Sequence, residues 1–524
     1  MSASPRIGVG LCGELEQETG LELAAVAEAL EEVFSNVRVE VVPGLCRSPD
    51  HVPPLASRTG ATRMALGLCA PSTRGDEFQA WARRVGLDPF ALELVDLEGA
   101  ESSKVAVRVL TGALARLTAF PGSTPEQVKL RLTSFEQRRT RRSLLTLPPT
   151  TYAPVAHIEE ESCLGRRRCG LCVEVCPFSA IGPIGGRLAV DRERCESCGA
   201  CVPSCPTRAI GLPSSTLSEY EAEIAVLLAA ESPSLLFTCR RAAVNHAAGN
   251  GLAPLSAGWL PVTVPCLGIV TPGWILQALA RGASAVALLG CGDGCFSRSS
   301  AVRDRVSFIR EVLQLLGAGA ASERVAVLSA GSDLPRVGPR QPAMHELGWR
   351  VLDGELSLLE PGATTEAVVA LAERSNAIGV SLAHTGSPLG LVSLREETCT
   401  ACGACPTVCP TEALLGEQGA RGESIITFDA GRCVACGNCV RVCPEQALET
   451  LSVRAGIDVL ALTHGRAVLK RARSASCRRC GGPIAPDAML NRIRTLLETD
   501  DSSGPLIATL TQLCSDCRAL DSAL

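Results

Sequence analysis

Apolar residues recur along two stretches of the chain at the spacings of short strands and amphipathic helices. Between residues 6 and 120, Arg38 to Val42 and Arg63 to Ala70 have the pattern of strands, and Leu21 to Phe34 and Asp76 to Val85 that of helices. A second stretch predicts strands at 234–239, 260–266, 283–291 and 324–330 and helices at 272–281 and 302–316. Strands that alternate with helices predict two doubly wound α/β domains.

Three of the four strands predicted in the second stretch end in cysteine, namely Cys239, Cys266 and Cys291. The carboxyl ends of parallel strands meet at one edge of a sheet, and ligands of open α/β domains bind at that edge. We therefore expect these thiols to lie together as part of a cofactor site.

The composition indicates metal binding in a reducing compartment. Among 524 residues there are 27 cysteines, in short tandem spacings that are typical of metal sites rather than of disulfide-rich secreted domains. We find no signal peptide, and no apolar run reaches the roughly 18 residues needed to span a bilayer. We expect a cytoplasmic protein of several domains that does not insert into a membrane.

Charge and aromatic content argue against nucleic acid as a partner. The net charge is −5, and aromatic residues make up 3% of the chain. Neither a strongly basic surface nor stacking platforms for bases are therefore expected. The 6 histidines include no pair at metal-ligand spacing, and we assign no catalytic residue.

Two consecutive cysteine runs, Cys399 to Pro410 and Cys433 to Pro444, have the spacing Cys-x2-Cys-x2-Cys-x3-Cys-Pro. They resemble bacterial ferredoxins, in which each run gives three thiolates to one [4Fe-4S] cluster and its fourth to the neighbouring cluster. The implied ligand sets are Cys399, Cys402, Cys405 and Cys443 for one cluster, and Cys433, Cys436, Cys439 and Cys409 for the other. A pair of zinc sites is the alternative.

An earlier pair of runs, Cys163 to Pro177 and Cys195 to Pro206, repeats this pattern with one wider spacing. The implied sets are Cys195, Cys198, Cys201 and Cys176 for one cluster, and Cys163, Cys169, Cys172 and Cys205 for the other. Leu164 to Arg168 place five residues, three of them Arg, where two are usual. Their positive charge could raise the potential of that cluster. In the alternative, Cys163 is not a ligand and the cluster is [3Fe-4S] or absent.

The segments Leu236 to Cys239, Val264 to Gly268 and Leu289 to Cys295 resemble the delta subunit of the methyl-viologen-reducing hydrogenase. The implied cofactor is a [2Fe-2S] cluster, which in that family passes electrons from a dehydrogenase partner to a heterodisulfide-reductase-like unit. Its implied ligands are Cys239, Cys266, Cys291 and Cys295. Ala242 stands where the family often has a further Cys. Buried cysteines without a cofactor are the alternative.

The segments around Cys12, Cys46 and Cys69, together with Gly86 to Phe90, resemble the amino-terminal region of the heterodisulfide reductase A subunit. The resemblance implies a further iron–sulfur cluster with Cys12, Cys46 and Cys69 as candidate ligands, although the two-Cys start of the family is reduced to Cys12 alone. We find neither the FAD domain of that subunit nor the Cys-Cys pair of the disulfide-cleaving subunit. We therefore expect no FAD or NAD on this chain.

Gly8 to Gly13 has the letters of a dinucleotide fingerprint, Gly-x-Gly-x-x-Gly. Too few residues precede Gly8 for a normal buried first strand, and the next predicted strand ends at Val42 without an acid for the ribose. We expect no nucleotide site there.

The tail carries two Cys-x2-Cys pairs, formed by Cys477 and Cys480 and by Cys514 and Cys517. Four thiolates at these spacings predict a closed tetrahedral site, with zinc favoured over rubredoxin-like iron. Basic residues between 470 and 479 are interpreted as a solvated helix face or a surface for an acidic protein, with a nucleic-acid module as the remaining alternative.

These segments predict a multidomain α/β plus α+β protein. The expected boundaries are 1–120 for the N-terminal α/β domain, 121–155 for a linker, 156–213 for the first ferredoxin module, 214–345 for the second α/β domain, 346–390 for a linker region, 391–452 for the second ferredoxin module and 453–524 for a zinc-ribbon-like tail.

The favoured function is that of an iron–sulfur electron-transfer subunit of a cytoplasmic oxidoreductase complex. The expected cofactors are four [4Fe-4S] clusters, one [2Fe-2S] cluster, a further N-terminal cluster, and zinc or iron in the tail. The resemblances imply a hydrogenase or a formate or NAD(P)H dehydrogenase-type flavoprotein as one partner and heterodisulfide-reductase-like subunits as the other. The alternative is an oxidoreductase whose substrate binds to an open cluster at the three-Cys N-terminal site.

Overall fold

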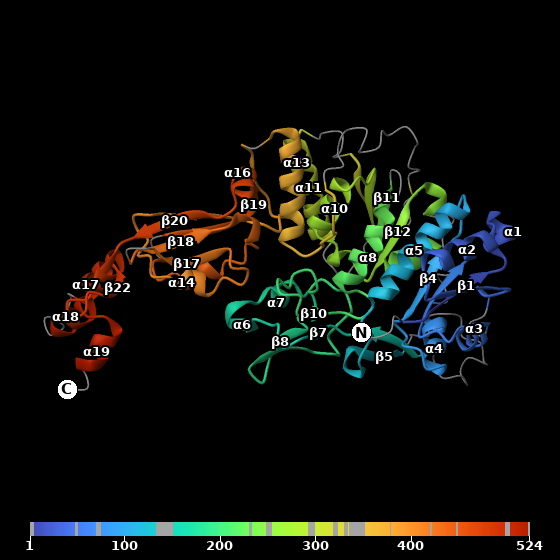
Figure 1. Cartoon of the computed structure of the whole chain (residues 1–524), viewed down its shortest axis with the longest axis horizontal. Helices are drawn as coiled ribbons and strands as arrows, with labels where there is room; N and C mark the ends of the chain where they lie inside the picture. Colours follow the sequence, from blue (N-terminus) through green and yellow to red (C-terminus); the bar gives the residue numbers. More distant parts are fainter. Residues whose placement is uncertain are drawn as a thin grey trace. The chain divides into compact units, whose positions relative to one another are not determined.

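The computed structural model of the chain (Figure 1) falls into two compact units. One is formed by Met1–Cys163 and Leu171–Ser375, and the other by Leu164–Gly170 and Asn376–Leu524. The structure describes residues 5–47, 51–69, 75–132, 150–229, 233–247, 254–291, 299–317, 323–329, 334, 352–377, 379–419, 422–446, 449–497 and 504–521. Within these ranges, no helix is long and apolar enough to cross a membrane.

The first unit begins with a four-stranded parallel sheet in the order β2-β1-β3-β4. Its strands are β1 (Ile7–Cys12), β2 (Val37–Val42), β3 (Arg63–Leu68) and β4 (Leu92–Asp96). β1 is buried along its whole length. The expectation that too few residues precede Gly8 for a normal buried strand was therefore wrong, because the strand itself begins at Ile7 and gains its hydrogen bonds from β2 and β3 on either side.

Two glycines of the fingerprint-like segment lie inside β1 rather than in a loop after it. A Cβ on Gly8 would stand 2.9 Å from Thr59 Oγ1, and one on Gly10 would stand 2.7 Å from Leu55 Cδ2. Thr59 and Leu55 belong to α3 (Val52–Thr59). These glycines therefore admit a closely packed helix, whereas a phosphate-binding turn would follow the strand.

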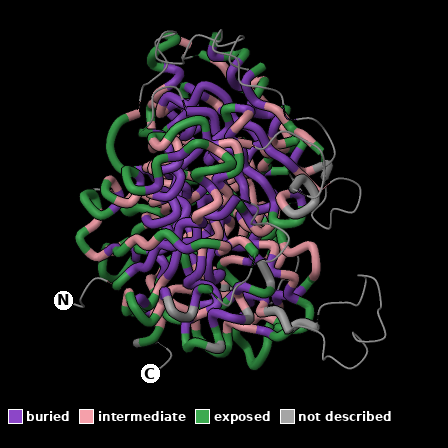
Figure 2. The backbone as a smooth tube through the Cα atoms, turned by 90° about the vertical axis from the view of Figure 1, so that its right-hand side faces the viewer, coloured by how far each residue is buried: buried purple, intermediate pink, exposed green. Residues whose placement is uncertain are grey.

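A second parallel sheet has the order β12-β11-β13-β14. Its strands are β11 (Ser234–Cys239), β12 (Leu260–Val264), β13 (Ala285–Gly290) and β14 (Val325–Ser329), all within the predicted ranges. α10 (Pro272–Ala280) and α11 (Ser299–Leu315) also lie close to their predicted positions. Figure 2 shows long buried stretches of backbone. Every residue of β11 is buried, and so are five of the six residues of β13.

Two long helices join the α/β domains within the first unit. α5 (Ser103–Ala119) begins at Ser102, whose side chain accepts a hydrogen bond from the Val105 N–H group at 3.4 Å. α8 (Leu217–Leu228) begins with a capping box made by Thr216 and Glu219. The two helices pack side by side.

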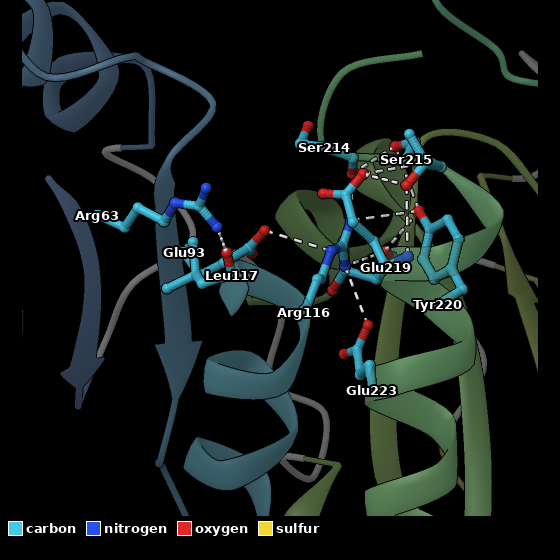
Figure 3. A network of polar contacts seen from close by, with 11 residues as sticks. Arg63, Glu93, Arg116, Leu117, Ser214, Ser215, Glu219, Tyr220 and Glu223 are labelled. Atoms are coloured by element: carbon cyan, nitrogen blue, oxygen red, sulfur yellow. Dashed lines mark hydrogen bonds and ion pairs between the residues drawn. The ribbon is translucent and has the colours of Figure 1, made fainter. Parts of the chain in front are cut away.

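Arg116 of α5, which is 5% exposed, lies at the centre of a buried polar network (Figure 3). Its guanidinium contacts Glu93 of β4 at 3.3 Å and Glu223 of α8 at 3.1 Å. It also donates to the Thr263 carbonyl of β12 at 3.2 Å and stacks 4.6 Å from the centre of the Tyr220 ring. Elements of both α/β domains are therefore held by one cation.

Residues 121–155 are more than the linker that we expected. β5 (Val128–Leu132) and β6 (Thr150–Pro154) form an antiparallel pair, and Val128 and Tyr152 pack against the buried cluster that contains Phe90 and Phe120. The alternation of apolar and basic residues from Val128 to Leu132 is a strand pattern, so the prediction overlooked a signal that the sequence carries.

The described part of residues 346–390 was also wrongly assigned to a linker. α13 (Gly362–Ser375) packs against α10. The Gln277 side chain donates to a carbonyl at the start of α13 at 3.0 Å. The Glu360 carboxylate accepts from the Gly273 N–H group in the first turn of α10 at 2.8 Å. This helix therefore completes the second α/β domain.

Short antiparallel strand pairs lie in both predicted ferredoxin modules. In the first, β7 (His157–Ile158) pairs with β10 (Ile210–Gly211), and β8 (Ile181–Ile184) with β9 (Arg187–Val190). In the second, β16 (Gly390–Leu394) pairs with β19 (Leu451–Asp458), and β17 (Leu414–Gln418) with β18 (Ser424–Phe428). The short helices are α6 (Gly165–Arg168), α7 (Leu171–Val175), α14 (Ala404–Thr407) and α15 (Asn438–Val442).

The tail begins later than the predicted residue 453. β19 continues to Asp458, where it also pairs with β15 (Ser381–Ala383), and β20 (Ala467–Ala472) adds a third strand beside β18. β21 (Ser474–Ser476) and β22 (Pro483–Pro486) then form a hairpin. Three helices follow, α17 (Asp487–Leu497), α18 (Gly504–Gln512) and α19 (Ser515–Asp521).

Candidate metal centres

One complete predicted cluster set comes together in the second ferredoxin module. Cys409, Cys433, Cys436 and Cys439 line a common cavity with apolar neighbours that include Phe428. Burial, with added repulsion from the other three thiols, raises the pKa of Cys433 to about 12. Cys409 belongs to the preceding run, so its thiol crosses to the neighbouring set as the ferredoxin pattern predicts.

The reciprocal crossing occurs in the other set of this module. Burial raises the pKa of Cys399, and the thiols of Cys402 and Cys443 raise it further. Cys405 has Cys439, Cys399 and Cys402 among its near neighbours. Cys443 comes from the second run, so each run contributes its last cysteine to the set of the other.

The backbone adopts the same local conformation at the start of all four runs. The second residue after the first cysteine is left-handed, with φ of 73° at Gly165, 56° at Ser197, 52° at Ala401 and 52° at Ala435. In three of the runs, the N–H group two residues after the first or second cysteine donates to a thiol and opposes the rise in pKa that burial causes, as at Cys198, Cys399 and Cys433. Such amide donors stabilise thiolates and therefore cluster ligands.

In the first ferredoxin module, Cys198 lies near Cys176 and Cys195. Burial raises the pKa of Cys198 to about 12, and these two thiols add to the shift. The buried Lys129 of β5 donates to the carbonyls of Arg192, at 3.0 Å, and of Cys195. A cation therefore stands beside the loop that carries this set, and the residues 121–155 supply it.

The set with the wider spacing draws on both units. Cys163, Cys172 and Cys205 belong to the first unit, whereas Cys169 lies in Leu164–Gly170 of the second. Its assembly around one cluster stays a prediction.

In the second α/β domain, Cys239, Cys266 and Cys291 stand at the carboxyl edge of the sheet. Cys239 is the last residue of β11, and Cys291 directly follows β13. Backbone N–H groups of Ala242 and Gly268 donate to the sulfurs of Cys239 and Cys266 at 3.3 and 3.5 Å. Cys295, the fourth predicted ligand, lies outside the described residues.

Arg305 of α11 holds the loop around Cys266. Its guanidinium donates to the carbonyls of Gly268 and Val270 at 3.1 and 2.8 Å. Burial lowers the pKa of Arg305, and the nearby Glu360 and Cys266 oppose that shift. The Cys266 site therefore has a neighbouring positive charge that no cysteine spacing predicts.

The three N-terminal thiols also meet. Cys69 Sγ lies 3.2 Å from Cys46 Sγ and 3.8 Å from Cys12 Sγ. Burial raises the pKa of Cys12 to about 12 and that of Cys69 further still. Glu14, which the sequence did not single out, accepts a hydrogen bond from Cys12 Sγ at 3.0 Å and from the Gly44 N–H group at 2.9 Å.

The four tail cysteines lie within 4.8 Å of one another, as a single tetrahedral ion requires. Backbone N–H groups of Cys514 and Cys480 lower the pKa of Cys477 to about 6. Cys477 and Cys480 lie in the hairpin between β21 and β22, whereas Cys514 and Cys517 lie at the junction of two helices. The second half therefore differs from the zinc-ribbon-like tail that we expected.

Comparisons with known proteins support the two principal motifs. Residues 235–336 match the methyl-viologen-reducing hydrogenase delta subunit. Residues 398–447 match the 4Fe-4S dicluster domain, and residues 188–211 the 4Fe-4S binding domain. No curated protein matched the chain. The similarity to the hydrogenase delta subunit and to ferredoxins is confirmed, while the resemblance to the heterodisulfide reductase A subunit stays a prediction.

Proposed function

We propose that the chain is an electron-transfer subunit of an oxidoreductase complex in the cytoplasm. Its partners are a hydrogenase or a formate or NAD(P)H dehydrogenase-type flavoprotein on one side and heterodisulfide-reductase-like subunits on the other. The support comes from the matched 4Fe-4S domains and from the domain similar to a hydrogenase delta subunit.

We assign the proposed cofactors to the four ferredoxin-type cysteine sets and to the cysteines at the carboxyl edge of the second sheet. The ferredoxin-type sets take four [4Fe-4S] clusters, and Cys239, Cys266 and Cys291 with Cys295 take one [2Fe-2S] cluster. These cofactors amount to about 18 irons per chain. Iron analysis of anaerobically purified protein measures this number, and about 8 irons would contradict the inventory.

The observation that carries the relay is the contact between two different redox sites. Gly199, between two ligands of one ferredoxin set, lies so close to the Cys266 loop that a Cβ would stand 3.0 Å from Ile269 Cδ1 and 3.3 Å from Pro265 Cγ. Cys266 is also among the thiols that raise the pKa of Cys198. Neighbouring ligands of two cofactors give electrons a short path from one module to the other.

Widening this contact should slow electron transfer between the two sites. In Gly199→Leu, the new side chain must push against Ile269 and Pro265, so stopped-flow spectroscopy should show slower exchange between the [2Fe-2S] and ferredoxin signals. Gly403→Leu is the matched control, because Gly403 has the same motif position and a similar φ, 75° against 74°, with no atom within 4 Å of its Cβ position. Equal rates in both variants would contradict the proposed path.

Removing the charge of Arg305 should lower the reduction potential of the Cys266 site. A nearby cation stabilises the reduced cluster, which carries the more negative charge, so Arg305→Met should lower the potential by on the order of 50 to 100 mV. Arg305→Lys keeps the charge and should change the potential much less. Redox titration followed by electron paramagnetic resonance measures both variants, and an unchanged potential in Arg305→Met would refute the electrostatic role.

The partners can be identified by anaerobic purification of the tagged chain from its native host, followed by mass spectrometry. Recovery with a flavoprotein, hydrogenase or dehydrogenase together with heterodisulfide-reductase-like subunits is the expected result. Recovery of the chain alone, with intrinsic turnover of a substrate, would instead favour the enzyme alternative.

A further inference from the structure

The two α/β domains share one construction. Both sheets are parallel and have the same strand order when numbered within each domain, the second strand followed by the first, third and fourth. The register of the strands matches as well. In the N-terminal domain the first strand pairs with the third at Ile7 and Arg63, and in the second α/β domain the first strand pairs with the third at Ser234 and Ala285. Ile7 therefore corresponds to Ser234, and Cys12 corresponds to Cys239.

The sequences that lead into the third strands are also alike. Gly-Ala-Thr-Arg-Met-Ala-Leu-Gly-Leu-Cys ends at Cys69, and Gly-Ala-Ser-Ala-Val-Ala-Leu-Leu-Gly-Cys ends at Cys291. The alanine after the helix-ending glycine donates to the carbonyl five residues earlier in both, at 3.3 Å from Ala61 and 2.9 Å from Ala283. Cys69 therefore corresponds to Cys291.

The next position continues this agreement. The N–H group of the following residue donates to the carbonyl that precedes the first strand, Thr62 to Arg6 at 3.0 Å and Ser284 to Pro233 at 2.7 Å. A shared strand order, register, sequence and set of turn hydrogen bonds indicates an internal duplication. The N-terminal thiols thus occupy the cofactor edge of a second copy of the domain.

The cysteine that follows the second strand lies at different positions in the two domains. Val42 and Pro43 correspond in register to Val264 and Pro265, and Cys266 comes directly after its proline. In the N-terminal copy Gly44 holds that position, and Cys46 comes two residues later. Cys12 and Cys69 therefore lie at the same positions as Cys239 and Cys291, whereas Cys46 lies two residues after the position that corresponds to Cys266.

The three N-terminal thiols lie close enough together to bind one metal ion. Cys12, Cys46 and Cys69 lie within 4.8 Å of one another, and the tail set is the other group of described residues that meets this limit. Two thiolates bound at about 2.3 Å to one tetrahedral ion stand about 3.8 Å apart, close to the 3.2 and 3.8 Å observed. Ligands of a four-iron cluster bind to different irons and stand farther apart.

Glu14 supplies the site with a carboxylate. Its position is fixed by the Gly44 N–H group, and it accepts from Cys12 Sγ at 3.0 Å. Binding of a cation requires the thiols to lose their protons, and the carboxylate of Glu14 lies directly beside them. Among the described residues no fourth ligand atom joins the three thiols within 4.8 Å.

We propose that the N-terminal domain is a diverged copy of the second α/β domain in which Cys12, Cys46 and Cys69 bind a single thiophilic divalent cation, Zn²⁺. The fourth coordination position is left to an exogenous ligand such as water, as in open zinc sites. This site replaces the iron–sulfur cluster expected from the resemblance to the heterodisulfide reductase A subunit.

Metal analysis of the full chain tests this proposal. Wild-type protein should hold about two zinc ions, one in the tail and one in the N-terminal domain. Cys46→Ser and the tail variant Cys480→Ser should each lose one zinc and no iron. Loss of iron from Cys46→Ser, or zinc unchanged in that variant, would overturn the proposal.

X-ray absorption at the zinc edge provides a second measurement that leaves the N-terminal domain intact. In Cys480→Ser, the remaining zinc should be bound by three sulfurs and one oxygen or nitrogen. Four sulfurs, or no remaining zinc, would refute the three-thiolate site even if Cys46→Ser fails to fold.

Discussion

Replacing Arg116 by Met should lower the free energy of unfolding of the first unit by about 3 to 5 kcal/mol, because removal of one partner leaves buried charges uncompensated. Arg116 and Glu223 both lie in the interior, with 5% and 8% of their surfaces exposed. Met fills a similar volume but cannot contact Glu93, Glu223 or the Thr263 carbonyl. Denaturant unfolding under argon, followed by circular dichroism, measures the loss.

The loss should depend on pH in a defined direction. Burial raises the pKa of Glu223 from 4.5 to about 7, against the opposing effect of Arg116. A raised carboxyl pKa means that the folded state binds the proton more tightly than the unfolded state, so this contribution is present below pH 4.5 and lost as the pH rises through about 7. Without Arg116 the carboxyl stays protonated to higher pH. The destabilisation by Arg116→Met should therefore be larger at pH 8 than at pH 5.

Arg58→Met is the control for a general effect of removing an arginine. Arg58 pairs with Glu40 at 2.6 Å, but the two side chains are 55% and 30% exposed. Exposed pairs contribute little to stability, because water and salt screen the two charges. Equal losses in the two variants would show that the network of Arg116 has no special role in joining the α/β domains.

Cys409→Ala should abolish the cluster of the run that begins at Cys433, although Cys409 itself belongs to the run that begins at Cys399. Cys409 shares its cavity with Cys433, Cys436 and Cys439, so the variant should lose about four irons from that set. The remaining clusters should keep their spectra. Iron analysis and electron paramagnetic resonance after stepwise reduction measure the loss.

Three further variants test whether Cys409 is a ligand of the neighbouring cluster or of the cluster formed by its own run. Cys433→Ala should give the same spectrum as Cys409→Ala, whereas Cys405→Ala and Cys443→Ala should share a different one. If Cys409→Ala instead matched Cys405→Ala, the crossing of the last cysteine would be wrong.

Cysteine spacing predicted the ferredoxin sets because the ligands are local in sequence and the cluster fixes their separation. The strand Ser234–Cys239 was predicted to the residue, since a buried parallel strand is a continuous apolar run between polar residues. By contrast, β1 was misjudged because residues before Gly8 were counted as the strand, whereas the glycines themselves lie within it.

The buried basic residues that stabilise the domains and the loops around the cysteine sites could not be recognised from the sequence. Arg116, Lys129 and Arg305 are single basic residues in helices or strands, and nothing in their surroundings separates them from exposed arginines or lysines. Their roles depend on carbonyls and carboxylates that are distant in sequence. The duplication of the α/β domains could have been found by comparing the segments ending at Cys69 and Cys291, but the strand register was needed to establish it.

The packing of α13 on α10 also bears on how this chain could have been assembled from older genes. The match to the hydrogenase delta subunit ends at residue 336, yet the amide of Gly273 and the side chain of Gln277 are satisfied by residues beyond it. α10 is buried at every position, so a recombination break near residue 336 would transfer a fragment with an uncovered apolar helix. The compact domain therefore extends to Ser375, and we expect a fusion that preserves its stability to join after α13.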